Sequence, residues 1–115
     1  MRRLIVLSIL LFASVAFAAK YSETSGEKTA DVAVTSSTAY ITAVQVITDG
    51  TNDAKLIVYD NTAASGTVVT EISVVGADNY GGRVWVRPVK CSNGIYGDIT
   101  GTGASFIIEF TRTAE

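Results

Sequence analysis

The stretch "CSNGIYGDITGTGASFIIEF", residues 91–110, decides the fold class. It holds two short runs of β-branched and aromatic residues, and two clusters of Ser, Asn, Gly and Thr that are typical of turns. In the last run Phe106, Ile108 and Phe110 alternate with mostly polar residues, which is the period of a half-buried strand. We therefore expect two strands here, with "TGTG" (100–103) as the loop of a hairpin.

The same pattern recurs upstream, where turn clusters separate runs dominated by Thr, Val and Ile and nothing indicates a helix. The predicted strands are 31–35, 39–48, 54–60, 67–74, 83–89, 95–99 and 104–110. They predict an all-β fold, a two-sheet antiparallel β-sandwich of about seven short strands, jelly-roll or immunoglobulin-like. The Cys…Trp…Cys spacing of true immunoglobulin domains is absent.

Alternation also predicts which side chains of two further strands face the core. The inward set is Val68, Ile72, Val74, Val84 and Val86. The outward set is Glu71, Ser73, Arg83, Trp85 and Arg87.

Residues 1–18, "MRRLIVLSILLFASVAFA", follow the plan of an export signal, with Ala16-Phe17-Ala18 as the cleavage site. A membrane anchor is the alternative, but the apolar run 4–17 is shorter than the roughly 20 residues that a spanning helix needs. We expect a flexible lead-in at 19–30 and the sandwich domain at 31–115. Without residues 1–18 the formal charge falls from −2 to −4, which argues against nucleic acid and anionic lipid as partners.

The composition argues against an enzyme. The chain has no histidine and a single cysteine, so the commonest general base, a Cys-His pair and a structural zinc site are all missing. We predict no cofactor and no metal, and a buried, inert Cys91. The turn aspartates are predicted to cap the local backbone. "DGTND" (49–53) is interpreted as a plain hairpin turn between two strands, with an oxygen-rich cation loop as the alternative.

Two strands are candidates for binding a partner. "AKLIVYD" (54–60) is apolar on both faces, and such a strand needs cover from another subunit, a loop or a ligand. "RVWVR" (83–87), with Tyr80 nearby, suggests an exposed aromatic surface flanked by cations, although Trp85 capping the core is the alternative. The candidate interface residues are Leu56, Ile57, Val58, Tyr59, Tyr80, Arg83, Trp85 and Arg87.

Two segments carry a resemblance, "LIVYDNTAASGTVV" (56–69) and "CSNGIYGDITGTGAS" (91–105). With the strands around them, they resemble small β-proteins that recur among bacteriophage structural genes. The resemblance implies a virion component, capsid-decorating or fibre-associated, that associates with itself and with other virion proteins. It implies no catalytic residues, and contact with a membrane only through an uncleaved N-terminal segment, which a virion protein would keep as an assembly arm.

The alternative function is a secreted or cell-surface module that binds glycans. The export signal and the aromatic surface around Tyr80 and Trp85 favour it.

Overall fold

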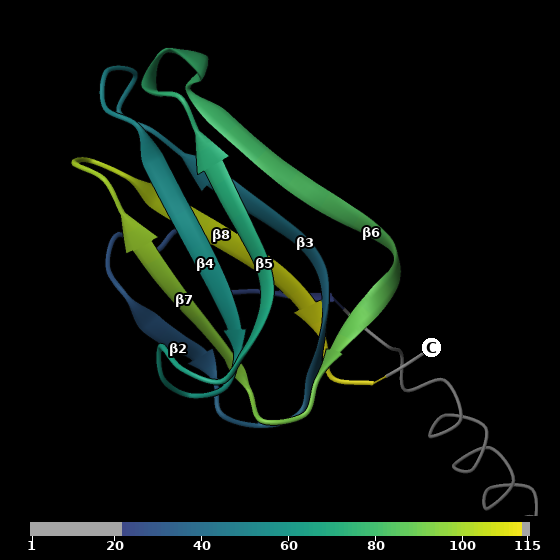
Figure 1. Cartoon of the computed structure of the whole chain (residues 1–115). Coiled ribbons are helices and arrows are strands. Elements are labelled where there is room, and N and C mark those ends of the chain that lie inside the picture. The colour runs from purple at the N-terminus through teal and green to yellow at the C-terminus, as the bar shows by residue number, and fades with distance from the viewer. Residues whose placement is uncertain (1–21, 114–115) are drawn as a thin grey trace, which may run out of the picture.

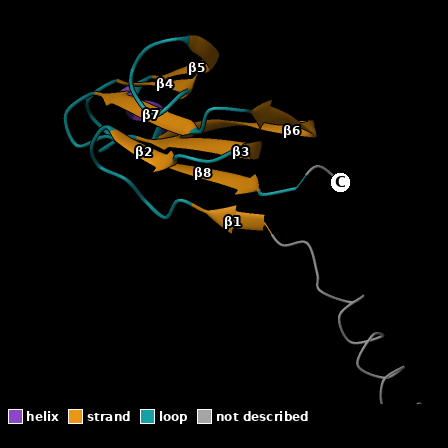
Figure 2. Cartoon of the chain, turned by 90° about the horizontal axis from the view of Figure 1, so that it is seen from below, coloured by secondary structure: helices purple, strands orange, loops and turns teal. Residues whose placement is uncertain are grey.

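Two antiparallel sheets make up the part of the protein that the structure, a computed structural model, describes, which is residues 22–113. Sheet A has the strand order β1 (Ser22–Thr24), β8 (Ser105–Thr111), β3 (Ala39–Ile47), β6 (Tyr80–Cys91). Sheet B has the strand order β2 (Val32–Thr35), β7 (Ile95–Thr100), β4 (Ala54–Asp60), β5 (Thr67–Val74). A short 3-10 turn, η1 (Gly76–Asp78), precedes β6. The sheets form two layers (Figures 1 and 2), which confirms the predicted β-sandwich.

The strand pairing is that of a jelly roll. β1 pairs with β8, β2 with β7, β3 with β6 and β4 with β5, all antiparallel. The chain therefore doubles back on itself, and the doubled ribbon wraps into two sheets, which is how a jelly roll is built. Of the two folds expected from the sequence, the jelly roll is the one observed.

The predicted hairpins at 100–103 and 49–53 are wrong. Both connections cross between the sheets, since β7 and β4 belong to sheet B whereas β8 and β3 belong to sheet A. β7 already has β2 and β4 as neighbours, and β8 has β1 and β3, so neither strand has an edge left for the other. Among the described strands only β4 and β5 are consecutive in sequence and hydrogen-bonded to each other.

The core lies between the layers and follows the predicted alternation in β8. Phe106, Ile108 and Phe110 are all buried and Ile107 points to the opposite face, half-buried. Phe106 is the largest fully buried side chain, and its ring lies against Gly97 of β7 in the facing sheet. The other buried apolar residues are Ala39, Ile41, Val44, Val46, Ala54, Leu56, Val58, Val74, Cys91, Ile95 and Ala104.

The N-terminal side contains a strand that the sequence did not predict. Ser22–Thr24, within the expected lead-in at 19–30, forms β1 along the edge of β8. Beyond it, Lys28 and Phe106 exchange backbone hydrogen bonds of 2.8 and 2.9 Å. All three residues of β1 are exposed, so no apolar alternation marks the strand. The predicted export segment at 1–18 lies outside the described residues, and within 22–113 no helix is long and apolar enough to cross a membrane.

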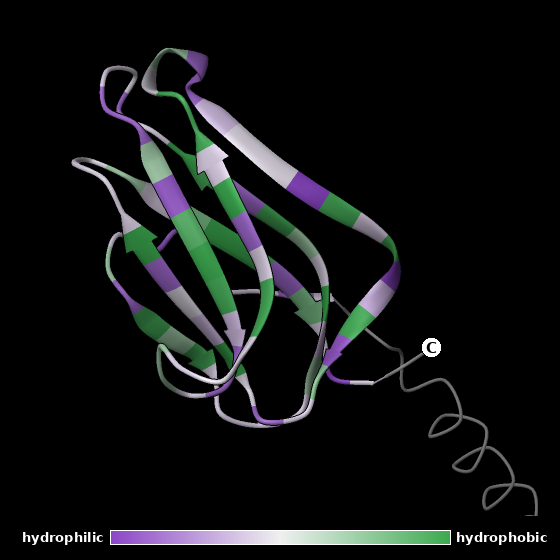
Figure 3. Cartoon of the chain, in the orientation of Figure 1, coloured by the Kyte–Doolittle hydropathy of each residue, from purple (hydrophilic) through white to green (hydrophobic). Residues whose placement is uncertain are grey.

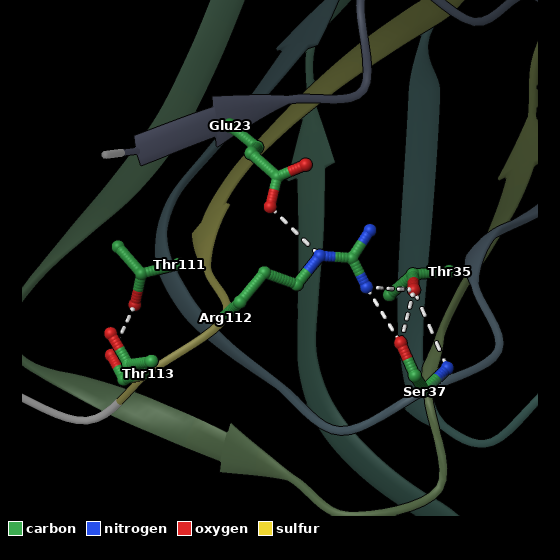
Figure 4. Close-up of polar contacts among 6 residues, drawn as sticks. All are labelled: Glu23, Thr35, Ser37, Thr111, Arg112 and Thr113. Atoms are coloured by element: carbon green, nitrogen blue, oxygen red, sulfur yellow. Dashed lines mark hydrogen bonds and ion pairs between the residues drawn. The ribbon is translucent and has the colours of Figure 1, made fainter. Parts of the chain in front are cut away.

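Arg112, just after β8, ties the two ends of the described chain together (Figure 4). Its Nε donates to Glu23 Oε2 at 2.8 Å, and its Nη1 donates to the hydroxyls of Thr35 and Ser37 at 2.7 and 2.6 Å. The guanidinium carbon also lies 5.2 Å from the centre of the Phe110 ring. One side chain thus joins β1, the end of β2 and the end of β8.

We expect Arg112→Met to lower the free energy of unfolding by about 1–2 kcal/mol, since hydrogen bonds to a charged group are lost while the aliphatic stem is kept. Urea titration measures the loss, and amide hydrogen exchange should show it concentrated in β1. Lys55→Met is the matched control, because it removes the exposed ion pair to Glu71 and should change stability little. Equal effects of the two variants would contradict this role of Arg112.

Candidate functional site

β6, an edge strand of sheet A, carries a wide bulge. The residues of β3 on either side of Thr42 pair with Val84 and Val89, so that Thr42 alone opposes residues 85–88. Extra residues bend a strand, and Figure 1 shows β6 bowing away from β3 in its middle. Pro88 lies in this bulge, where its missing N–H leaves no ladder hydrogen bond unmade.

The side chains of β6 face the opposite way from the prediction. Trp85 is half-buried and packs against the core, whereas Val84 and Val86 are 79% and 101% exposed. The prediction that the valines face inward and the tryptophan outward is therefore wrong. Arg83 pairs with the buried Val44 and Val84 with Ala43, so the register ahead of the bulge already turns Val84 away from the core. The alternative, a Trp85 that caps the core, is the one observed. The Arg83 guanidinium lies 5.0 Å from the Trp85 ring centre.

The large apolar residues left exposed all belong to one lateral edge of the sandwich. Each lies on β5, on the connection to β6, or on β6 itself. These two edge strands contact each other, so they form one side of the molecule, which we call the β5–β6 side. Its exposed apolar residues are Val68, Val75, Tyr80, Val84 and Val86. Figure 3 shows apolar and hydrophilic bands alternating along β6.

β4 divides its apolar residues between two faces, as predicted. Leu56 and Val58 are fully buried in the core of their own chain, so they cannot contact another molecule. Ile57 and Tyr59 lie half-buried on the outer face of sheet B. Of the four interface candidates in this strand, two are therefore core residues and two remain available.

An apolar row crosses the outer face of sheet B. Tyr96 of β7 and Val68 of β5 lie directly opposite Tyr59 on its two sides. Val68 was predicted to face the core, and that prediction is wrong. The register shifts at Val69, and this extra residue turns Val68 outward, where it is half-exposed.

Carboxylates lie beside this row. Asp98 and Glu71 flank Ile57 on the neighbouring strands. Burial, together with the nearby Asp31 carboxylate, raises the pKa of Asp98. Asp31 itself accepts a hydrogen bond from the Ile99 N–H at 2.8 Å. The sequence gives no sign of the Asp31–Asp98 contact, because β2 and β7 are paired across more than sixty residues of chain.

A groove of about 290 Å³ lies on the outer face of sheet A. Tyr80, 65% exposed, lines it together with Gln45 and Glu109. Gly82 also lines it, and a Cβ there would come within 2.5 Å of the Val44 carbonyl oxygen. Trp85 does not line the groove, so the structure separates the two aromatic residues that the sequence suggested as one surface.

Asp49, Asp53 and Asp60 accept backbone N–H groups, as predicted for the turn aspartates, whereas Asp98 lies within strand β7. Asp49 Oδ1 accepts the N–H groups of Asn52 and Thr51 at 2.7 and 2.9 Å, which lowers the pKa of Asp49. Asp53 accepts the Gly76 N–H at 2.9 Å and so joins this turn to η1. Within residues 22–113 no three of His, Cys, Asp and Glu come together as metal ligands.

Cys91 is fully buried at the end of β6, which confirms the prediction of a buried thiol. Burial raises its pKa to about 12. A thiol that stays protonated at neutral pH is a poor nucleophile and a poor metal ligand.

Comparison of the chain with protein-family models, with curated proteins and with solved structures found no match.

Proposed function

We propose that this protein is a non-enzymatic structural protein that associates with copies of itself through the β5–β6 side. The observation that carries the proposal is that all large exposed apolar residues in the described part lie on this side. Together they expose on the order of 500 Å², near the upper end of what monomers leave open. A stable interface takes about 800 Å² from each partner. Because Val68 faces outward from sheet B, and Tyr80 and Val84 from sheet A, a single interface covers only part of this exposed area.

A virion component, capsid-decorating or fibre-associated, is the setting that this proposal favours. Jelly rolls occur in viral capsid proteins, and also in lectins, so the topology agrees with the resemblance without deciding the function. Other virion proteins are then further partners. The alternative location is the cell surface or the medium, after cleavage of the export segment.

Self-association is tested with Val86→Asp. We expect the wild-type protein, isolated as its cell makes it, to be multimeric in sedimentation equilibrium. The variant should be monomeric, because an interface that buries an unpaired carboxylate is strongly destabilised. Thr102→Asp, in the exposed β7–β8 connection, is the matched control and should stay multimeric. A wild-type protein that remains monomeric up to millimolar concentration would refute the proposal.

Glycan binding is the second candidate, and the groove at Tyr80 favours it. Its volume of about 290 Å³ lies near the lower end for small-ligand sites, which suits a single sugar ring. Tyr80 offers a face for stacking, and Gln45 and Glu109 offer hydrogen bonds to hydroxyls.

This candidate predicts binding on a glycan array that Tyr80→Ala weakens by about tenfold, the loss of one stacking contact. Calorimetry with the best array ligand measures the change. Val86→Asp is the control that should bind normally, since Val86 does not line the groove. Absence of binding to any glycan, or equal binding by the Tyr80 variant, would count against this function.

A further inference from the structure

Basic side chains are concentrated on β6. Three of the six Lys and Arg residues between 22 and 113 lie on this strand, and the strand has no acidic residue. The three are Arg83, Arg87 and Lys90. Within the described residues none of them forms an ion pair, whereas Lys55 and Arg112 do. The exposed valines 84 and 86 lie among these cations. We call residues 83–87 the β6 ridge.

The outer face of sheet B has the opposite character. Ile57, Tyr59 and Tyr96 are only half-buried there, and the carboxylates of Asp98 and Glu71 lie on either side of Ile57. Lys55 offsets part of the charge through an exposed ion pair to Glu71 at 2.7 Å. Such a pair is worth little and is easily exchanged. We call this surface the acidic face.

We propose that the β6 ridge of one copy docks on the acidic face of the next copy. The inference rests on the proposed self-association and adds the counter-surface. Apolar residues meet apolar residues in this arrangement, and unpaired cations meet carboxylates, which is the complementarity that selects one docking mode among several.

The spacing of the charges agrees with this docking. Asp98 and Glu71 lie two strand spacings apart, across β4, which is about 10 Å. Arg83 and Arg87 lie four residues apart on β6, which is at most about 13 Å and less across the bulge. One arginine can therefore approach each carboxylate. Val84 and Val86 alternate with the arginines and project from the other side of β6, so β6 must meet the face along its edge for these valines to reach Ile57 and Tyr59 as well.

The Asp31–Asp98 contact supports the same docking. Burial is the main cause of the raised pKa of Asp98, and the nearby Asp31 carboxylate is the second, because two carboxylates close together disfavour ionisation of one another. Within the described residues no cation forms an ion pair with either carboxylate. A guanidinium from a neighbouring copy would relieve the repulsion.

Such a contact is heterologous, because two different surfaces of the same chain meet. Each copy then keeps one free ridge and one free face, so association continues until a ring closes or a filament forms. A β6-to-β6 contact, in contrast, would stop at the dimer.

Two charge reversals test the inference, Arg87→Glu on the ridge and Asp98→Lys on the face. Each variant alone should associate at least about tenfold more weakly than wild type, since like charges then oppose each other. An equimolar mixture should recover wild-type association to within a few-fold, because the carboxylate introduced on the ridge of one variant meets the ammonium introduced on the face of the other, and the remaining contacts are native. Sedimentation equilibrium measures all three samples, and thermal unfolding confirms that each variant is folded.

The outcomes separate this inference from the proposed function. If wild type is monomeric, the proposed function fails and the inference fails with it. If Val86→Asp dissociates the assembly but Asp98→Lys does not, self-association stands, and the ridge docks elsewhere, on a second ridge or on a different protein. Failure of the mixture to recover association would also overturn the inference.

Discussion

Phe106→Ala is expected to lower the free energy of unfolding by about 3–5 kcal/mol. Phe106 is 0% exposed and sits on β8, which has neighbours on both edges. Its ring fills the space over Gly97 in the facing sheet, so its removal opens a cavity that a glycine cannot fill. A domain of this size has roughly 5–15 kcal/mol of total stability, and the variant therefore approaches the unfolded state at room temperature.

The measurement is urea unfolding followed by Trp85 fluorescence. Both Phe106→Ala and its reference protein should also carry Val86→Asp, because association would make the measured stability depend on protein concentration. Val84→Ala is the matched control, since its side chain is mostly exposed and should matter by less than about 0.5 kcal/mol. A loss below about 1 kcal/mol for Phe106→Ala would mean that the ring does not hold the two sheets together.

Strand positions were predictable wherever turn residues stand at both ends of a run in which apolar and polar residues alternate regularly. The bounds of β4 and β5 are those expected, and Phe106, Ile108 and Phe110 face the core as the period of two requires. Pairing between strands was not predictable, because local turn signals look alike in a hairpin and in a connection between sheets. β1 was missed since its three residues are polar and exposed.

The candidate site was predictable in place but not in orientation. The sequence pointed to 83–87 and 54–60, and both segments do carry exposed or half-exposed apolar residues. The bulge at Val69 then exchanged inward and outward residues in β5, whereas β6 alternates throughout in the phase opposite to the predicted one. Nothing local marks such a bulge, because it arises from the register against the neighbouring strand. The apolar row on the outer face of sheet B was unpredictable for the same reason, since Tyr59 and Tyr96 become neighbours only through the pairing of β4 with β7.

Gly97→Val is expected to lower the free energy of unfolding by about 3 kcal/mol, as overpacking at a rigid site does. Strand propensity alone predicts the opposite, because valine is favoured over glycine in strands by up to about 1 kcal/mol. At this position a Cβ would overlap the Phe106 ring. The ring cannot move aside, because it is enclosed by the core, so the clash outweighs the propensity.

A double-mutant cycle isolates this clash. With Phe106→Ala already present, Gly97→Val should cost far less or even stabilise, since the new methyl groups enter the cavity left by the ring. The coupling between the two changes should reach about 2 kcal/mol or more, within the range for residues in direct contact. Phe106→Leu replaces Phe106→Ala if the latter does not fold. Additive effects of the two substitutions would show that Gly97 is required for its backbone rather than for the space above it, and the close approach of β7 to β8 would then have another cause.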